Sequence, residues 1–193
     1  MPSVFSHPVV PLAIASVAGT SKVPFRLFLA GAIFAILPDA DVLGFRFNIP
    51  YEHLFGHRGF FHSPIFALGA SLIGALACHA LRSSYKSTFI VLFISMLSHG
   101  LLDAATSGGL GIAFLSPFNN HRFFLPWQPI VVSPFSLERF FSSRGLMVIQ
   151  SELLWVWAPF MIIGFLGFVI RHKTAPNPAV QWTARAGPPN RLF

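Results

Sequence analysis

The stretch TFIVLFISMLSHGLLDAA, residues 88–105, decides how this chain folds. Its length and apolar character are those of a helix that crosses a bilayer, which needs about 20 residues. Two ionisable residues, His99 and Asp103, stand near its end, and a spacing of four places both side chains on one helix face. Hydrocarbon strongly disfavours charge, so ionisable residues at the end of a span are functional candidates.

The composition of the whole chain is that of a membrane protein. Of its 193 residues, 54% are hydrophobic and only 10% are charged, against about 25% charged in soluble domains. The net charge of +7 comes from basic residues scattered through the connections. We therefore expect these residues to set membrane orientation and to meet anionic headgroups, with no nucleic acid as partner. The single cysteine, Cys78, excludes an intrachain disulfide.

Five apolar runs predict the architecture. They cover residues 9–19, 27–43, 64–81, 88–105 and 146–170, and the first is short for a span. The segment 106–144 is too interrupted by proline to cross a membrane. We therefore expect an all-α, polytopic membrane helical bundle of four or five spans, with a Pro/Phe-rich cap between the last two. Residues 1–170 would form one integral membrane domain that carries a metal site, and residues 171–193 a disordered basic tail.

The basic residues predict an orientation. If all five runs span, one side of the membrane receives Lys22, Arg26, Arg82, Lys86, Arg171 and Lys173. Connections rich in lysine and arginine stay cytoplasmic. The opposite, non-cytoplasmic side then receives the loop 44–63 and the cap, together with every candidate site residue named below.

The motif Pro38-Asp39-Ala40-Asp41 places two carboxylates where the second run ends. A carboxylate at a helix C-terminus meets the unfavourable end of the helix dipole. This penalty favours a compensating cation, which is either a metal ion or an arginine. The alternative is a polar terminator that faces water.

The motif H-R-G-F-F-H-S, residues 57–63, leads into the third run. Its two histidines flank a turn and can converge, while Arg58 offers a bidentate fork for phosphate or carboxylate. Ser63-Pro64 has the pattern of a helix N-cap followed by proline at the first helical position. The alternative is an interfacial loop whose basic side chains reach toward headgroups.

Histidines mixed with carboxylates form the ligand set of a divalent metal, zinc first and manganese second. The predicted metal ligands are His7, Asp39, Asp41, His57, His62, His99 and Asp103. We predict catalytic roles for Arg58, which would steady anionic charge, and for Glu152, as a general acid or base or as the partner of an arginine. The purely structural alternative is that His99 and Asp103 form a hydrogen-bonded pair that stabilises the end of the helix. Four ionisable residues, Glu52, His53, His79 and His172, are left out of the site.

His7 and the motifs P-D-A-D, H-R-G-F-F-H-S and S-H-G-L-L-D-A-A-T-S-G-G together resemble the YdjM family of bacterial inner-membrane proteins, over about residues 6–134. The resemblance implies an inner-membrane location and a metal-dependent hydrolase, and some members are described as binding the LexA repressor. Phe61 departs from the pattern, because many members carry threonine there. The His-x-x-x-Asp helix is also loosely similar to zinc-dependent phospholipase C and P1-type nucleases, which suggests a phosphoester substrate.

The function that we predict is a membrane-embedded metal-dependent hydrolase acting on a lipid or envelope phosphoester at the membrane surface. The main alternative is a non-catalytic metal-binding membrane protein: a sensor, a transporter or a scaffold. Transport is disfavoured because the ionisable residues crowd one end of the spans rather than their middle. Electron transfer by haem or quinone would need histidines paired across spans within the apolar layer. His99 alone approaches this arrangement, so electron transfer is disfavoured.

Overall fold

The computed structural model describes residues 1–134 and 136–174, and the regular elements among them are helices, as expected. The helical elements, in chain order, are α1 (Val9–Ala18), α2 (Phe25–Ile36), the 3-10 helix η1 (Leu37–Phe47), η2 (Phe60–His62), α3 (Pro64–Gly74), η3 (Ala75–Ala77), α4 (Tyr85–Ala104), α5 (Leu137–Phe140), α6 (Ser143–Glu152), η4 (Leu153–Trp157) and α7 (Ala158–Thr174). Two isolated bridges, Thr106 with Ile130 and Ile112 with Phe123, tie the loops together.

Three continuous helical stretches are long and apolar enough to cross a membrane: Phe25–Phe47, Tyr85–Ala104 and Ser143–Thr174. The apolar helices Val9–Ala18 and Pro64–Ala77 are shorter, so a total of four or five spans stays a prediction. The last helix runs to Thr174, past residue 170, where the tail was expected to begin. The rest of that predicted tail, residues 175–193, lies outside the described residues.

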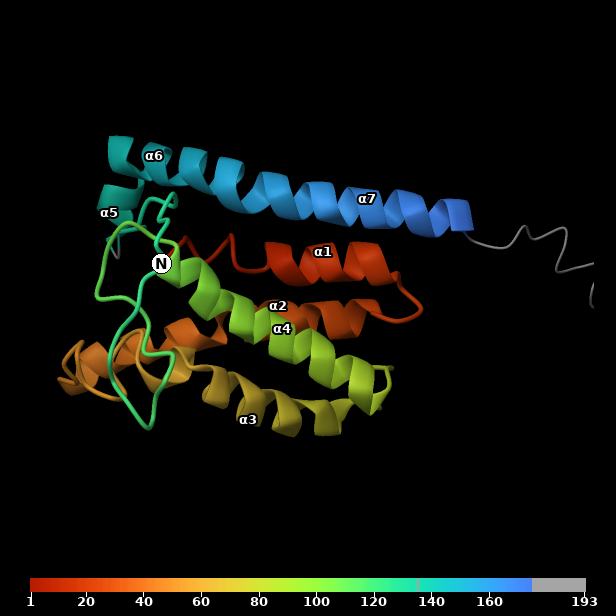
Figure 1. Cartoon of the computed structure of the whole chain (residues 1–193), viewed down its shortest axis with the longest axis horizontal. Coiled ribbons are helices and arrows are strands. Elements are labelled where there is room, and N and C mark those ends of the chain that lie inside the picture. Colours follow the sequence, from red (N-terminus) through yellow and green to blue (C-terminus); the bar gives the residue numbers. More distant parts are fainter. Residues whose placement is uncertain (135, 175–193) are drawn as a thin grey trace, which may run out of the picture.

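The long helices lie side by side and the loops gather at one end (Figure 1). Helix α1 packs against α7, and α4 packs against both α2 and α3. Small residues allow these close approaches, as is usual between helices in a bilayer. At Gly31, an added Cβ would lie 3.1 Å from Pro11 and 3.2 Å from Val91.

Helix α3 begins as its sequence predicts. The side chain of Ser63 accepts a hydrogen bond from the backbone N–H of Phe66 at 3.1 Å, and Pro64 occupies the first helical position. This cap fixes the direction in which the chain enters α3, and therefore the place of His62 immediately before it.

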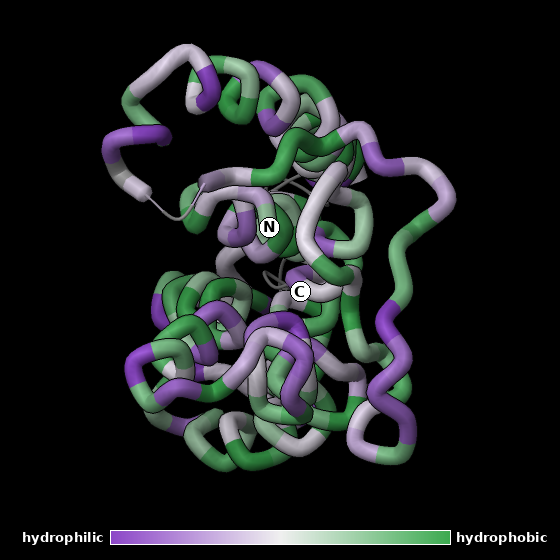
Figure 2. The backbone as a smooth tube through the Cα atoms, turned by 90° about the vertical axis from the view of Figure 1, so that its left-hand side faces the viewer, coloured by the Kyte–Doolittle hydropathy of each residue, from purple (hydrophilic) through white to green (hydrophobic). Residues whose placement is uncertain are grey.

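The segment between α4 and α5 folds back over the loop end of the bundle. Its backbone is anchored there by hydrogen bonds from Ala113 to Arg58 and from Leu125 to Ala104. Figure 2 views this end and shows hydrophilic and hydrophobic stretches alternating along the loops. The site described next lies beneath this segment.

Candidate metal centre

The three sequence motifs converge at the loop end of the bundle. Asp39 and Asp41 belong to η1, which continues α2, while His62 ends η2 and His99 and Asp103 lie in the last turns of α4. His62, His99 and Asp103 are almost completely buried. The convergence requires no large loop excursion, because each residue sits where its helix ends or begins.

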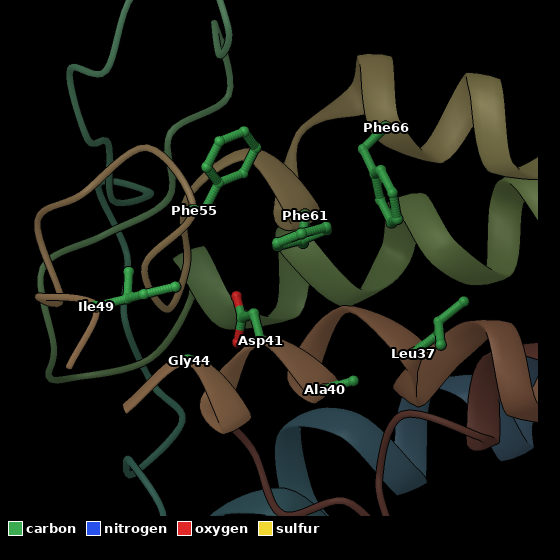
Figure 3. Close-up of a pocket in the computed structure, with 8 residues that line it drawn as sticks. All are labelled: Leu37, Ala40, Asp41, Gly44, Ile49, Phe55, Phe61 and Phe66. Atoms are coloured by element: carbon green, nitrogen blue, oxygen red, sulfur yellow. The ribbon is translucent and has the colours of Figure 1, made fainter. Parts of the chain in front are cut away.

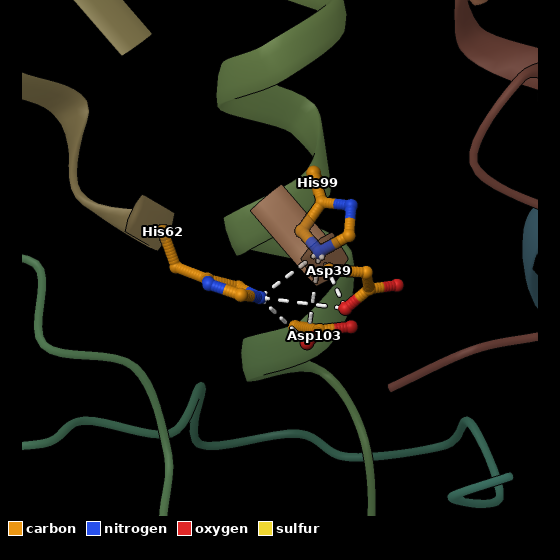
Figure 4. A group of neighbouring side chains, drawn as sticks. All are labelled: Asp39, His62, His99 and Asp103. Carbon is orange, nitrogen blue, oxygen red and sulfur yellow. Dashed lines mark hydrogen bonds and ion pairs between the residues drawn. The ribbon is translucent and has the colours of Figure 1, made fainter. Parts of the chain in front are cut away.

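Four of these residues form what we call the inner ligand group: Asp39, His62, His99 and Asp103. Each offers one ligand atom, and these atoms all lie within 4.8 Å of one another (Figure 4). Asp39 Oδ1 is 3.3 Å from His99 Nε2 and 3.6 Å from His62 Nε2. Asp103 Oδ2 is 3.7 Å from His62 Nε2 and 4.0 Å from His99 Nε2. Ligands about 2.0–2.2 Å from one tetrahedral ion stand roughly 3.3–3.6 Å apart, so small adjustments would suit a metal.

Contacts behind the two histidines aim their Nε2 atoms at this group. His99 Nδ1 lies 2.7 Å from the carbonyl oxygen of Ala35, which assigns the proton to Nδ1 and leaves a lone pair on Nε2. His62 Nδ1 lies 3.1 Å from Asp41 Oδ2. A carboxylate or carbonyl behind a ligating imidazole is the usual arrangement in metal sites.

The proton balance of His62 depends on its carboxylate neighbours. Burial by itself lowers the pKa of His62, but Asp39 and Asp41 outweigh it and raise the pKa to about 9. Without a metal ion, His62 therefore carries a proton at neutral pH. This proton occupies the position that a cation would take.

Asp41 and His57 lie one layer outside the inner ligand group. Asp41 Oδ1 is 2.7 Å from His57 Nδ1, and Asp41 Oδ2 accepts a hydrogen bond from the backbone N–H of Arg58 at 3.2 Å. Burial lowers the pKa of His57, although Asp41 opposes the shift. Asp41, His57 and His62 are close enough to form a second possible ion site, so ligation by the first two stays a prediction.

Arg58 is buried and its guanidinium is bound by the protein itself. Nε donates to Asp103 Oδ2 at 3.1 Å, Nη1 to the carbonyl of Gly108 at 2.7 Å and Nη2 to Thr106 Oγ1 at 2.9 Å. Gly109 has a φ of 91°, and a Cβ there would lie 2.5 Å from Nη1. The turn T-S-G-G, residues 106–109, thus binds the guanidinium of Arg58. Arg58 in turn orients Asp103.

Glu152 is also buried, but its partners are serines and not the arginine that the sequence suggested. It accepts hydrogen bonds from the backbone N–H of Ser3 and from the hydroxyls of Ser3 and Ser6, the last two at 2.6 Å. Trp157 Nε1 donates to Ser6 Oγ at 3.0 Å. Glu152 therefore fastens the N-terminal segment, which carries His7, to the last long helix.

His7 reaches the outer edge of the inner ligand group. Its Nε2 lies 3.9 Å from Asp39 Oδ2 and 3.9 Å from Asp103 Oδ1. Its ring stacks on that of His99 with centroids 3.9 Å apart. Burial lowers the pKa of His7 to about 3, so its imidazole is neutral and able to bind a metal.

Two pockets flank η1. An apolar pocket of about 470 Å³ is lined by Leu37, Ile49, Phe55, Phe61 and Phe66, with the Asp41 carboxylate as its charged group (Figure 3). A second pocket, of about 340 Å³, is lined by Asp39, Ser3, Ser133 and Ser136 among others. We call these the phenylalanine-side pocket and the serine-side pocket. Asp39 connects the serine-side pocket directly to the inner ligand group.

Residues left out of the predicted site lie elsewhere. Glu52, His53, His79 and His172 are all exposed. In the cap, Arg122 donates to the carbonyl oxygens of His57 and Tyr51 at 2.9 and 2.7 Å, which is a structural role. Sequence reasoning assigned no role to Ala35, Thr106 or Gly108. Thr106 and Gly108 lie within the S-H-G-L-L-D-A-A-T-S-G-G motif, but a hydroxyl or a backbone carbonyl oxygen gives no sign of its partner in the sequence.

Comparison with known proteins identifies the family of the chain. The family described as YdjM inner membrane protein matches residues 1–175. The chain belongs to the YdjM family. It is 46% identical over 164 residues to the inner membrane protein YbcI of Escherichia coli (strain K12). The aligned region covers 84% of this chain and 95% of that protein. No solved structure is significantly similar. The inner-membrane location and the family resemblance expected from the motifs are therefore confirmed.

Proposed function

We propose that this YdjM-family protein is a membrane-embedded, metal-dependent hydrolase that acts on a lipid or envelope phosphoester. The observation that carries the proposal is the inner ligand group, in which four donor atoms from three separate helical elements point at one another within 4.8 Å.

Unsatisfied buried atoms support a cation at this place. Within the described part of the chain, both oxygens of Asp39 and Oδ1 of Asp103 lack a hydrogen-bond partner. Burying a carboxylate without compensation costs several kcal/mol, on the order of the penalty for any uncompensated buried ion. A divalent cation removes that cost, and mixed nitrogen and oxygen donors fit zinc, with manganese as the alternative.

A bound divalent ion would supply Lewis-acid polarisation of a phosphoryl oxygen and would make water acidic enough to act near neutral pH. The chain supplies the rest. Asp41 and Ala35 hold the two inner histidines in orientation, and Arg58 holds Asp103. We therefore assign Arg58 and Glu152 to positioning: the first aligns a ligand and the second secures the segment that bears His7.

The surroundings favour a lipid as substrate. The phenylalanine-side pocket is apolar except for Asp41, and it adjoins the C-terminal end of α2 and the N-terminal end of α3, which suits an acyl chain. The serine-side pocket is also largely apolar, but Asp39, Ser133 and Ser136 in its lining give it polar groups that could meet a headgroup. We propose that α1 and α3 also cross the membrane. The site then faces the non-cytoplasmic side, opposite the turns that contain Lys22 and Lys86.

The burial of the inner ligand group favours a second candidate, a metal-binding protein without catalysis, such as a sensor or a structural scaffold. His99 and Asp103 are fully buried, as is common in structural metal sites. Both candidate functions require bound metal, but only the hydrolase turns over a substrate.

The test is hydrolysis by protein purified into lipid nanodiscs and reconstituted with Zn²⁺ or Mn²⁺. Phosphomonoester, phosphodiester and glycerophospholipid substrates should be offered, beside Asp39→Asn and the exposed-histidine control His79→Ala. We expect metal-dependent turnover in wild type and His79→Ala, and loss in Asp39→Asn. A metal-loaded protein that turns over none of these substrates would favour the non-catalytic function.

A further inference from the structure

Asp39 and Asp103 each direct their two oxygens to different neighbours. Asp39 Oδ1 and Asp103 Oδ2 face His62 and His99. The other oxygens, Asp39 Oδ2 and Asp103 Oδ1, are each 3.9 Å from His7 Nε2. Figure 4 shows these second oxygens turned away from His62. The two carboxylates therefore stand between two sets of donors.

The outer set is buried and unsatisfied. His7 is fully buried, and among the described residues neither of its ring nitrogens has a hydrogen-bond partner. The same holds, across residues 1–134 and 136–174, for Asp39 Oδ2 and Asp103 Oδ1. The Met1 amino group, 4.0 Å from Asp103 Oδ1, is too distant for a hydrogen bond. An imidazole and two carboxylate oxygens that make no hydrogen bond in a buried site are costly, and a cation between them removes that cost.

The chain holds His7 in this place with several contacts. Its ring stacks on His99, which belongs to the inner ligand group. The neighbouring Ser6 is bound by both Glu152 and Trp157 from the last long helix. A buried glutamate in a membrane helix is expensive, so its use to fasten this segment indicates that the position of His7 matters.

We propose that the centre holds two divalent ions, the second bound by His7 Nε2, Asp39 Oδ2 and Asp103 Oδ1, with both aspartates bridging. This inference rests on the proposed metal centre and extends it from one ion to two. Three protein ligands leave a position open for substrate, as in catalytic sites. The serine-side pocket, which Asp39 lines, adjoins this position.

A pair of ions gives a further reason for the phosphoester substrate of the proposed function. Paired ions about 3.5–4 Å apart are typical of phosphatases and nucleases, where they stabilise the attacking and the leaving oxygen of one phosphoryl group. The competing place for a second ion is the group Asp41, His57 and His62. There, however, Asp41 already pairs with both histidines, at 2.7 and 3.1 Å.

The experiment counts ions and detects their coupling without measuring activity. Wild type, His7→Ala, His7→Gln and His57→Ala, in nanodiscs, are loaded with Mn²⁺, desalted, and examined by elemental analysis and electron paramagnetic resonance. Adjacent manganese ions give an exchange-coupled spectrum, and an isolated ion gives a six-line spectrum. We expect about two ions and the coupled spectrum in wild type and His57→Ala. We expect about one ion and the six-line spectrum in both His7 variants, with His7→Gln covering the case in which His7→Ala does not fold.

The outcomes separate this inference from the proposed function. One isolated ion in wild type overturns the inference and leaves the proposed hydrolase intact. Loss of the coupled spectrum in His57→Ala, with its retention in the His7 variants, moves the second ion to the competing group and also overturns it. Two coupled ions with no turnover of any phosphoester overturn the hydrolase and leave the inference standing.

Discussion

The Nε2 atoms of His62 and His99 lie 3.1 Å apart in the buried end of the helix bundle. His99 uses its Nδ1 for the carbonyl of Ala35, so its Nε2 presents a lone pair to His62. Two imidazole lone pairs at this distance repel each other unless a proton or a metal ion lies between them. The contact therefore needs either a proton on His62 Nε2, hydrogen-bonded to His99 Nε2, or a metal ion between the two rings.

Asp41→Asn should weaken metal binding although Asp41 lies outside the inner ligand group. Asparagine keeps the size of the side chain but removes the charge that orients His62 and raises its pKa. Loss of such an outer partner typically costs 10–100-fold in metal affinity, so we expect a reduction of about that size. Competition with a chelator dye measures it. The control is Asn119→Asp, which exchanges an amide for a carboxylate in the exposed cap and should leave the affinity unchanged. Equal affinities in wild type and Asp41→Asn would show that Asp41 does not support His62.

Metal affinity should rise with pH. In the metal-free protein the pKa of His62 is raised to about 9, so His62 is protonated at neutral pH and must lose its proton to bind a metal. The apparent affinity should therefore increase by about tenfold per pH unit between pH 7 and 9, and level off above the pKa. Calorimetry in buffers of different ionisation enthalpy should detect release of about one proton near pH 8. A flat profile over this range would mean that His62 is neutral before the metal binds.

Arg58→Ala should destabilise the protein strongly. The substitution leaves the buried carboxylate of Asp103 without its guanidinium partner. It also removes the hydrogen bonds that the guanidinium donates to Thr106 and Gly108. Removing one partner of a buried ion pair costs about 3–5 kcal/mol. Unfolding in mild detergent, followed by circular dichroism, should show this loss, whereas Arg46→Ala, at an exposed position, should leave stability unchanged. Equal unfolding midpoints in the two variants would rule out a structural role for Arg58.

Glu152→Ala should release the N-terminal segment and act on the metal centre from a distance. It removes the acceptor for Ser3 and Ser6, and hydrogen bonds to a charged group contribute about 1.5–3 kcal/mol each. We expect occupancy of the His7 position to fall by at least about tenfold, while the inner ligand group keeps its ion, and Glu152→Gln should restore part of it. Manganese titration resolves the two steps. Simultaneous loss of both ions would instead assign Glu152 a role in the whole fold.

The location of the site at one end of the bundle could be predicted from the sequence. His99 and Asp103 share one helix face, and Asp39 and His62 stand at helix ends. To bring these four residues together, the apolar runs only have to lie side by side. The order of those runs then brings the motifs together, as observed for the inner ligand group.

The sequence could not predict which partner each residue of the site contacts. The sequence pattern predicts both Asp39 and Asp41 as metal ligands. In the structure, η1 continues as a 3-10 helix, in which residues two apart point in different directions, so Asp39 faces the inner group and Asp41 faces His57. The partners of Glu152 lie 146 and 149 residues away, and no local pattern in the sequence indicates such a contact.

Metal content tests the central claim most directly. Wild type, His99→Ala, Asp103→Ala and the control His79→Ala should be purified in native-like lipid without added metal, checked for intact fold and subjected to elemental analysis. We expect zinc or manganese in wild type and His79→Ala, and metal below about 0.1 equivalents in the two site variants. Equal metal content in all four proteins, or metal below about 0.1 equivalents in wild type, would contradict the claim.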